Sequence, residues 1–108
     1  MKKISIIVPC YNEQECILDS IDEIKLFIKK NSKYNFNVTF INDGSTDNTY
    51  SIITNIINNN KNFRLINFTK NFGHQSAVAA GINFCTDDAA IIIDADLQDP
   101  IDVASKMI

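Results

Sequence analysis

Short apolar runs alternate with longer amphipathic segments along this chain. Residues 4–8 form a β-branched apolar run before Pro9, which predicts a strand buried on both faces and ended by the proline. Similar apolar runs at 38–41, 63–68 and 89–93 predict three more strands. We therefore expect four short strands separated by connections long enough to hold helices.

The first connection has the spacing of an amphipathic helix. Isoleucines recur at intervals of three and four residues, at Ile17, Ile21, Ile24 and Ile28. Asn12, with Glu15 three residues later, resembles a capping box at the start of this helix. Lysines near its end, at Lys25, Lys29 and Lys30, suit the negative end of a helix.

Three more helices are predicted along the chain. The turn at 42–47 precedes apolar residues at helical spacing, and its Thr46 or Asp47 can cap the helix that follows. Gly73 precedes a helix over 75–84, whose alanines would let it lie close to a sheet. Asp99 and Pro100 fit the start of a last helix, as its cap and first residue.

This repeated order of strand and helix predicts an α/β fold, with a parallel sheet and helices on both faces, of the nucleotide-binding type. The chain has 108 residues, 45% of them hydrophobic and 21% charged, which suits one globular domain or a piece of one. The last predicted helix reaches Ile108 without a glycine, a cap or a polar tail. We interpret the C-terminus as a cut through a longer protein.

Composition removes several classes of function. The 10 basic residues are scattered among 13 acidic ones, for a net charge of −3, so no nucleic-acid surface is expected. Cys10, Cys16 and Cys85 are odd in number and lack zinc-site spacing, which favours reduced, buried thiols in a cytoplasmic protein. The apolar run near the N-terminus is too short for a secretion signal or a membrane span.

Polar and turn residues gather in the segments that follow the four strands, at 9–13, 42–47, 69–75 and 94–100. In open α/β sheets the ligand lies beyond the carboxyl ends of the strands, so we expect these segments to converge on one edge. Their carboxylates would repel an anionic ligand, because two unit charges about 4 Å apart cost roughly 4 kcal/mol at an effective dielectric near 20. A diphosphate would therefore bind there only with a divalent cation.

Asp94 and Asp96, which follow the fourth strand, can offer oxygen ligands to such a cation, and Gln98 adds a carbonyl oxygen on the same side. Ligands that are all oxygen favour Mg²⁺ or Mn²⁺ over zinc. Simpler roles compete at other positions of this edge. Asp47 and Asp99 suit helix caps, His74 and Lys70 suit a solvated surface, and Gly44 and Gly73 suit turns with positive φ.

Four ordered motifs carry a resemblance to a known family: IIVPCYNE, INDGSTDNT, TKNFGHQSAVAAG and IIIDADLQDP. Together they resemble the family-two glycosyltransferases, inverting enzymes of the GT-A fold that use nucleotide-sugar donors. The last two motifs are most similar to the branch that transfers sugars to polyprenyl phosphates. The resemblance covers essentially the whole chain. It implies that residues 1–108 are the nucleotide-sugar-binding half of a GT-A domain.

The resemblance also implies roles for single residues. Pro9, Tyr11 and Glu13 would line the nucleoside pocket, and Asp43 would contact the base. Lys70 and residues 71–73 would border the donor. Asp94 would lie by the ribose and the diphosphate and join Asp96 and Gln98 around the metal that bridges the two phosphates. Asn42 stands where many members of the family have an aspartate.

For the whole protein, the resemblance implies transfer of a sugar from a nucleotide-sugar, with UDP-sugar as the expected donor and a polyprenyl phosphate as the expected acceptor. The general base and most of the acceptor surface would lie beyond residue 108, so residues 1–108 alone would turn over little or nothing. Membrane association, at the cytoplasmic face, would come only from that missing part. An apolar face exposed by the truncation could also make the piece a homodimer.

Other interpretations stay open at this point. A nucleotidyltransferase usually has a Gly-rich basic loop after the first strand, and residues 9–13 hold neither glycine nor a basic residue. Phosphotransfer receivers and phosphatases place acidic residues after the first strand, whereas Asp94 and Asp96 follow the fourth. A glycosyltransferase with another saccharide acceptor, or a non-catalytic nucleotide-binding domain, fits the same residues.

Overall fold

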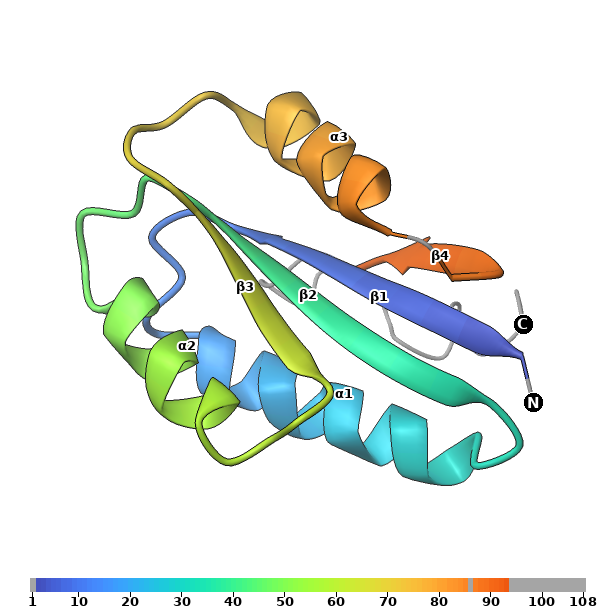
Figure 1. The fold of residues 1–108 in the computed structure, drawn as a ribbon. Coiled ribbons are helices and arrows are strands. Elements are labelled where there is room, and N and C mark those ends of the chain that lie inside the picture. The colour runs from blue at the N-terminus through green and yellow to red at the C-terminus, as the bar shows by residue number, and fades with distance from the viewer. Residues whose placement is uncertain (1, 86, 94–108) are drawn as a thin grey trace.

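A computed structural model of the chain describes residues 2–85 and 87–93. Four strands alternate with three helices in the predicted order: β1 (Lys3–Cys10), α1 (Ile17–Lys30), β2 (Asn35–Asp43), α2 (Thr49–Ile57), β3 (Phe63–Phe68), α3 (His74–Phe84) and β4 (Ala89–Ile92). The strands form one parallel sheet in the order β3-β2-β1-β4. Helices α1 and α2 cover one face and α3 covers the other (Figure 1). The predicted α/β class is confirmed.

The strand order explains why α3 lies apart from the other two helices. The chain moves outward from β1 to β3 through α1 and α2, and it then returns across β2 and β1 to form β4. Parallel crossovers are right-handed, so a reversal of direction puts the connecting helix on the opposite face. Strands β1 and β4, which lie side by side, therefore flank the point where strand order reverses.

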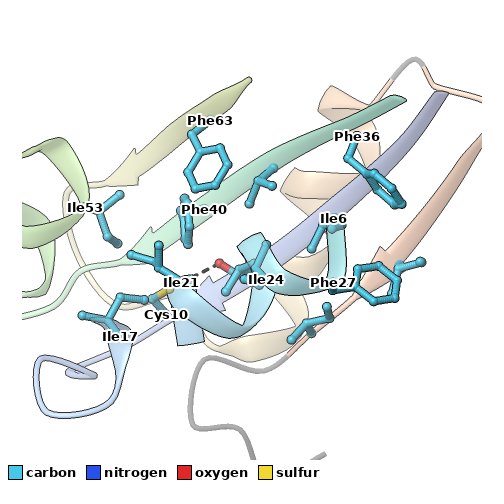
Figure 2. Packing of buried hydrophobic residues seen from close by; sticks show 14 of the residues in the cluster. Ile6, Cys10, Ile17, Ile21, Ile24, Phe27, Phe36, Phe40, Ile53 and Phe63 are labelled. Atoms are coloured by element: carbon cyan, nitrogen blue, oxygen red, sulfur yellow. Dashed lines mark hydrogen bonds between the residues drawn. The ribbon is translucent and has the colours of Figure 1, made fainter. Parts of the chain in front are cut away.

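The face under α1 and α2 holds the larger apolar core (Figure 2). Ile6 and Val8 of β1 point to this face and are fully buried with Phe40 of β2. The ring centroids of Phe40 and Phe63 lie 5.8 Å apart. Ile21 and Ile24 of α1 belong to the same cluster, as the helical spacing of the isoleucines predicts.

The apolar core under α3 is smaller, and small residues of the helix allow it to lie close to the sheet. Ala77 of α3 packs on Ile7 and Ile41, and all three are buried. A Cβ atom on Gly81 would stand 2.5 Å from Cγ2 of Ile7 and 3.0 Å from Cδ1 of Ile41. The predicted close approach of this helix to the sheet is therefore confirmed, and Gly81 sets its limit.

The prediction that Pro9 ends the first strand is wrong. β1 continues to Cys10, and Pro9 is buried opposite Ile41 of β2. The carbonyl of Ile7 accepts the N–H of Ile93 at 2.9 Å, so Pro9, two residues on, faces the same side. Because proline has no N–H, Pro9 donates no hydrogen bond toward β4, while the pairing of β1 with β2 continues to Cys10.

Two other predicted details change. The capping box at Asn12 is wrong, because α1 begins at Ile17 after Cys16, and no side chain caps it. A turn in which the Glu13 carbonyl accepts the N–H groups of Cys16 and Ile17 precedes the helix instead. The fourth strand, expected to be buried, is mostly exposed: Ile91 is the buried residue of Ala89–Ile92, and Ile92 is 46% exposed.

Candidate functional site

Three loops meet at the carboxyl edge of the sheet, as predicted. Loop 1 (residues 11–16) follows β1, loop 2 (44–48) follows β2, and loop 3 (69–73) follows β3. Figure 1 shows the three loops at the same end of the sheet. The segment 94–100, which was expected to join them, lies outside the described residues.

Loops 1 and 2 are joined through Asn12. This residue has a φ of +52°, which is uncommon for a residue other than glycine and is most often tolerated by asparagine or aspartate. Its side-chain oxygen accepts the N–H of Thr46 at 2.7 Å, and its own N–H donates to the Ser45 hydroxyl at 2.9 Å. These reciprocal bonds fix the two loops to each other.

A second set of bonds joins loop 1 to the start of α2. The Asp47 carboxylate accepts the N–H of Gln14 at 3.2 Å and, through its other oxygen, the N–H of Thr49 at 2.9 Å. The Thr49 hydroxyl, fully buried, accepts the N–H of Glu13 at 2.9 Å and donates to Asp47. Burial raises the pKa of Asp47, but hydrogen bonds from Thr49 and Gln14 outweigh it and hold the pKa below its usual value. The predicted cap at Thr46 or Asp47 is therefore wrong, because Asn48 is the residue that precedes α2. The Asp47 carboxylate nevertheless accepts the first N–H of the helix, from Thr49.

Loops 2 and 3 are joined by Asp43. Its carboxylate is 3% exposed and accepts the N–H groups of Phe72 at 2.7 Å and Gly73 at 3.0 Å. The Asn71 amide donates to the same carboxylate at 3.3 Å and to the Asp43 carbonyl at 3.2 Å. This carboxylate is therefore already partnered within the protein, and it is not an open ligand for a cation.

Glycines permit the close approach of loops 2 and 3. Gly44 has a φ of +69°, and a Cβ atom on it would stand 2.3 Å from the backbone carbon of Lys70 and 2.4 Å from the nitrogen of Asn71. Gly73 has a φ of +101° with no atom within 4 Å of its missing Cβ. The predicted need for positive φ at both glycines is confirmed.

An aromatic and basic surface borders loop 3. Phe72 is 53% exposed, and its ring meets that of Phe68 edge-on, with centroids 5.4 Å apart. The Lys70 ammonium lies 5.2 Å from the centroid of Phe72. Because Lys70 is exposed and its ammonium lies over the Phe72 ring, it can bind an anionic group without breaking a buried contact.

The structure brings together five of the predicted site residues, which differ in burial. Pro9 and Asp43 are buried at the ends of β1 and β2, and Glu13 is half-buried. Tyr11 and Lys70 are exposed on loops 1 and 3. Asp94, Asp96 and Gln98 lie outside the described residues, and residues 2–85 and 87–93 contain no group of three or more potential metal ligands from His, Cys, Asp and Glu.

The loop-bridging hydrogen bonds of three polar residues were not predicted: Asn12 was expected in a capping box, Asn71 was expected beside the donor, and Thr49 had no expected role. Only Asn12 carried a signal, as a residue type that tolerates positive φ within a turn. The described cysteines are free, as expected, but only Cys10 is buried. Burial, with the nearby charge of Glu13, raises the pKa of its thiol, so it stays protonated.

The comparison with protein families favours a glycosyltransferase over a nucleotidyltransferase, a phosphotransfer receiver or a phosphatase. Residues 5–108 match the profile of glycosyl transferase family 2. The chain belongs to this family. The bactoprenol glucosyl transferase of Shigella phage SfX is 42% identical over 106 residues, which are 98% of this chain and 34% of that protein. An uncharacterized glycosyltransferase of Bacillus subtilis, YkcC, is 38% identical over 104 residues, which are 96% of this chain and 32% of that protein.

Solved structures agree on the fold. The mannosyltransferase PcManGT from Pyrobaculum calidifontis, in complex with GDP-Man and Mn²⁺, has a TM-score of 0.76 and 24% identity, over 92% of this chain and 33% of that one. S. aureus TarS 1-349, in complex with UDP-GlcNAc, has a TM-score of 0.73 and 26% identity, over 87% of this chain and 26% of that one. The expected GT-A fold is thus confirmed. The chain spans about a third of the length of the curated relatives it matches.

Among the helices of the described residues, none combines the length and the apolar character that a bilayer crossing requires.

Proposed function

We propose that residues 1–108 bind the nucleotide part of a nucleotide-sugar in a glycosyltransferase that transfers the sugar with inversion. The observation that carries this proposal is the joining of loops 1, 2 and 3 at the carboxyl edge of a family 2 domain. A nucleotide bound there would meet a preorganised edge, because hydrogen bonds within the protein join the three loops.

Within this site, Pro9, Tyr11 and Glu13 line the nucleoside pocket. Asp43 contacts the base in this proposal, and it also holds loop 3 through the N–H groups of Phe72 and Gly73. Lys70 borders the diphosphate from loop 3. A uridine nucleotide is the proposed ligand, and the likeness to TarS, whose structure holds UDP-GlcNAc, supports it.

The oxygen-only set of Asp94, Asp96 and Gln98 suits Mg²⁺ or Mn²⁺, and these residues follow β4 directly in the sequence. The hydrogen bonds of two other carboxylates at this edge also support a cation site in the segment after β4. The carboxylates of Asp43 and Asp47 both accept hydrogen bonds from backbone N–H groups. We therefore expect the cation to bind to residues of the segment after β4. A bound divalent cation would offset the charge of the diphosphate and stabilise the departing nucleoside diphosphate.

Titration of UDP, GDP and their sugars, with Mn²⁺ or Mg²⁺ and again with chelator, tests the donor site. UDP should bind at least tenfold more tightly with Mn²⁺, and Asp96→Ala should remove most of that gain. Asp22→Ala, which removes an exposed carboxylate of α1, is the matched control and should bind as the wild type does. Equal affinity with and without metal, or an unchanged Asp96→Ala variant, would refute the metal site.

For the acceptor, we propose a polyprenyl phosphate on the cytoplasmic face of the membrane, in the synthesis of a lipid-linked glycan. The 42% identity to the bactoprenol glucosyl transferase supports this choice. The general base and the membrane association belong to sequence beyond residue 108. The protein that contains this chain should transfer sugar to a polyprenyl phosphate in vesicles; transfer only to a soluble saccharide would refute the acceptor while leaving the donor site intact.

A further inference from the structure

A polar cluster lies under the amino ends of the strands, at the edge of the sheet opposite loops 1–3. Ser5 of β1 is 1% exposed, and its hydroxyl donates to the Asp87 carboxylate at 2.5 Å. The Asn37 amide of β2 donates to the same oxygen of Asp87 at 3.2 Å. The Cys85 thiol donates to the Ser5 hydroxyl at 3.1 Å. These bonds tie the connection between α3 and β4 to both central strands.

The next residue adds two bonds to β1. The N–H of Asp88 donates to the Lys3 carbonyl at 2.9 Å, and the N–H of Lys3 donates to the Asp88 carboxylate at 2.9 Å. Both bonds lie directly before β4, which begins at Ala89. We call Ser5, Asn37, Asp87 and Asp88 the β4 latch.

Charge around Asp87 strengthens the latch. The hydrogen bond from Ser5 is the largest influence on the pKa of Asp87 and lowers it, while burial raises it. The bond from Asn37 and the positive charges of Arg64 and Lys3 lower it further, so the carboxylate stays ionised. Arg64 is itself held from the other side, with its guanidinium 5.1 Å from the centroid of the Phe84 ring.

The β4 latch adds directional hydrogen bonds to a short strand in which only part of the register is set by apolar burial. It pairs only with β1 within the described residues, over four residues from Ala89 to Ile92. A shift of two residues keeps every side chain on its face and moves the strand by about 6.6 Å. In the run Ala-Ala-Ile-Ile-Ile at 89–93, such a shift replaces Ile91 by Ile93 or Ala89 in the core. The shift that brings in Ala89 loses apolar burial at this position, whereas the shift that brings in Ile93 keeps it. Burial at the position of Ile91 therefore opposes only one of the two shifts, while the hydrogen bonds of the β4 latch oppose both.

We propose that the β4 latch fixes the register of β4 on β1 and thereby sets the position of the Asp94-x-Asp96 segment, with Asp87 and Ser5 as positioning residues. The ladder reaches Ile93, whose N–H donates to the Ile7 carbonyl, and Asp94 is the next residue. Residues 89–93 are all paired with β1, so a change of register at the amino end of β4 would also shift the residue that precedes Asp94. The link to the metal rests on the proposed donor site.

Amide exchange, measured by NMR in the absence of nucleotide, tests the latch itself. In Asp87→Ala and Ser5→Ala, the Ile93 amide should exchange at least tenfold faster than in the wild type. The Val38 amide, which donates to the Asn62 carbonyl on the far side of the sheet, should change less than threefold. Asp22→Ala on the exposed side of α1 makes the same charge change and should alter neither amide. Asp87→Asn keeps one oxygen that can accept both bonds, and it should restore most of the protection at Ile93.

UDP titration with and without Mn²⁺ tests the link to the acidic segment. In Asp87→Ala and Ser5→Ala, the gain in affinity from Mn²⁺ should fall at least fivefold, while affinity in chelator changes less than twofold because loops 1–3 are untouched. If Asp87→Ala does not fold, Ser5→Ala carries the test, with Asp87→Asn as the control that keeps an acceptor.

The outcomes separate the two proposals. Unchanged exchange at Ile93 in a folded Ser5→Ala variant overturns the latch. Faster exchange with an undiminished Mn²⁺ gain overturns its link to the acidic segment. A wild type with no Mn²⁺ gain refutes the proposed metal site, and the exchange measurement then judges the latch alone.

Discussion

The two faces of the sheet are held by different forces. Under α1 and α2, large side chains such as Phe40, Ile21 and Ile24 form a broad apolar core. Under α3 the apolar contact is small, and hydrogen bonds of an aspartate fix the chain at each end of the helix. Asp43 of β2 accepts a bond from loop 3 before α3, and Asp87 after α3 accepts a bond from β1. Apolar burial is strong but non-directional, whereas hydrogen bonds fix position. Loop 3 and β4 both lie next to α3 in the chain. Directional hydrogen bonds therefore fix the position of the segments that lead to the candidate site.

The largest expected loss of stability lies in the broad core. Phe40→Ala should lower the free energy of unfolding by about 3–5 kcal/mol, because the fully buried ring leaves a cavity against Phe63. Leu26→Ala, on the exposed side of α1, should cost about 0.5 kcal/mol or less. Urea unfolding measures both. Equal losses in the two variants would contradict the assignment of the core to this face.

The anchor of loop 3 gives the next largest effect. Gly44→Ala should cost about 2–4 kcal/mol, because its Cβ would meet the backbone of Lys70 and Asn71 and its φ is +69°. Gly73→Ala also places alanine at positive φ, but it meets no atom within 4 Å, so it should cost about 1–2 kcal/mol. The difference between the two unfolding energies measures the contact between the loops; no difference would show that only backbone strain matters.

The contrast between the faces also explains what the sequence could predict. Hydrophobic periodicity predicted the helices under the broad core, and small residues predicted the close packing of α3, because both patterns repeat along the chain. Pro9 was misassigned as a strand end because its missing N–H matters only on the side that faces β4. That side is set by the tertiary pairing of strands distant in sequence.

The polar contacts of the candidate site were the least predictable part. Asp43 was expected to contact the base, a role that stays a prediction, yet its bonds to loop 3 join residues 28 to 30 positions apart. Asn12 was expected to cap α1 and instead joins loop 2. Each such side chain has several possible donors or acceptors nearby in sequence, and only the assembled edge selects among them.

Thr49 offers a smaller effect, at the contact between loops 1 and 2. Thr49→Val keeps the shape of the buried side chain but leaves the N–H of Glu13 without its acceptor, so it should cost about 1–3 kcal/mol. Thr54→Val, whose hydroxyl donates to a carbonyl within α2 at an exposed position, should cost about 0.5 kcal/mol or less. Urea unfolding again compares them, and a similar cost at both positions would refute a special role for the Thr49 bridge.

The smallest expected effect is the pH dependence of stability from the two aspartates with lowered pKa, Asp47 in loop 2 and Asp87 in the β4 latch. In the unfolded chain each carboxyl takes up a proton near its ordinary pKa of 3.8, before the folded protein does. Stability from both is therefore complete well above pH 3.8 and is lost as the pH falls through the lower, folded values. Urea midpoints measured from pH 6 to pH 2.5 should show this loss. Ser5→Ala should reduce only the part due to Asp87, since it removes the main cause of that shift, and Thr49→Val only the part due to Asp47. If the urea midpoint of either variant falls with pH as steeply as that of the wild type, the hydrogen bond that the variant lacks does not control the pKa of its aspartate.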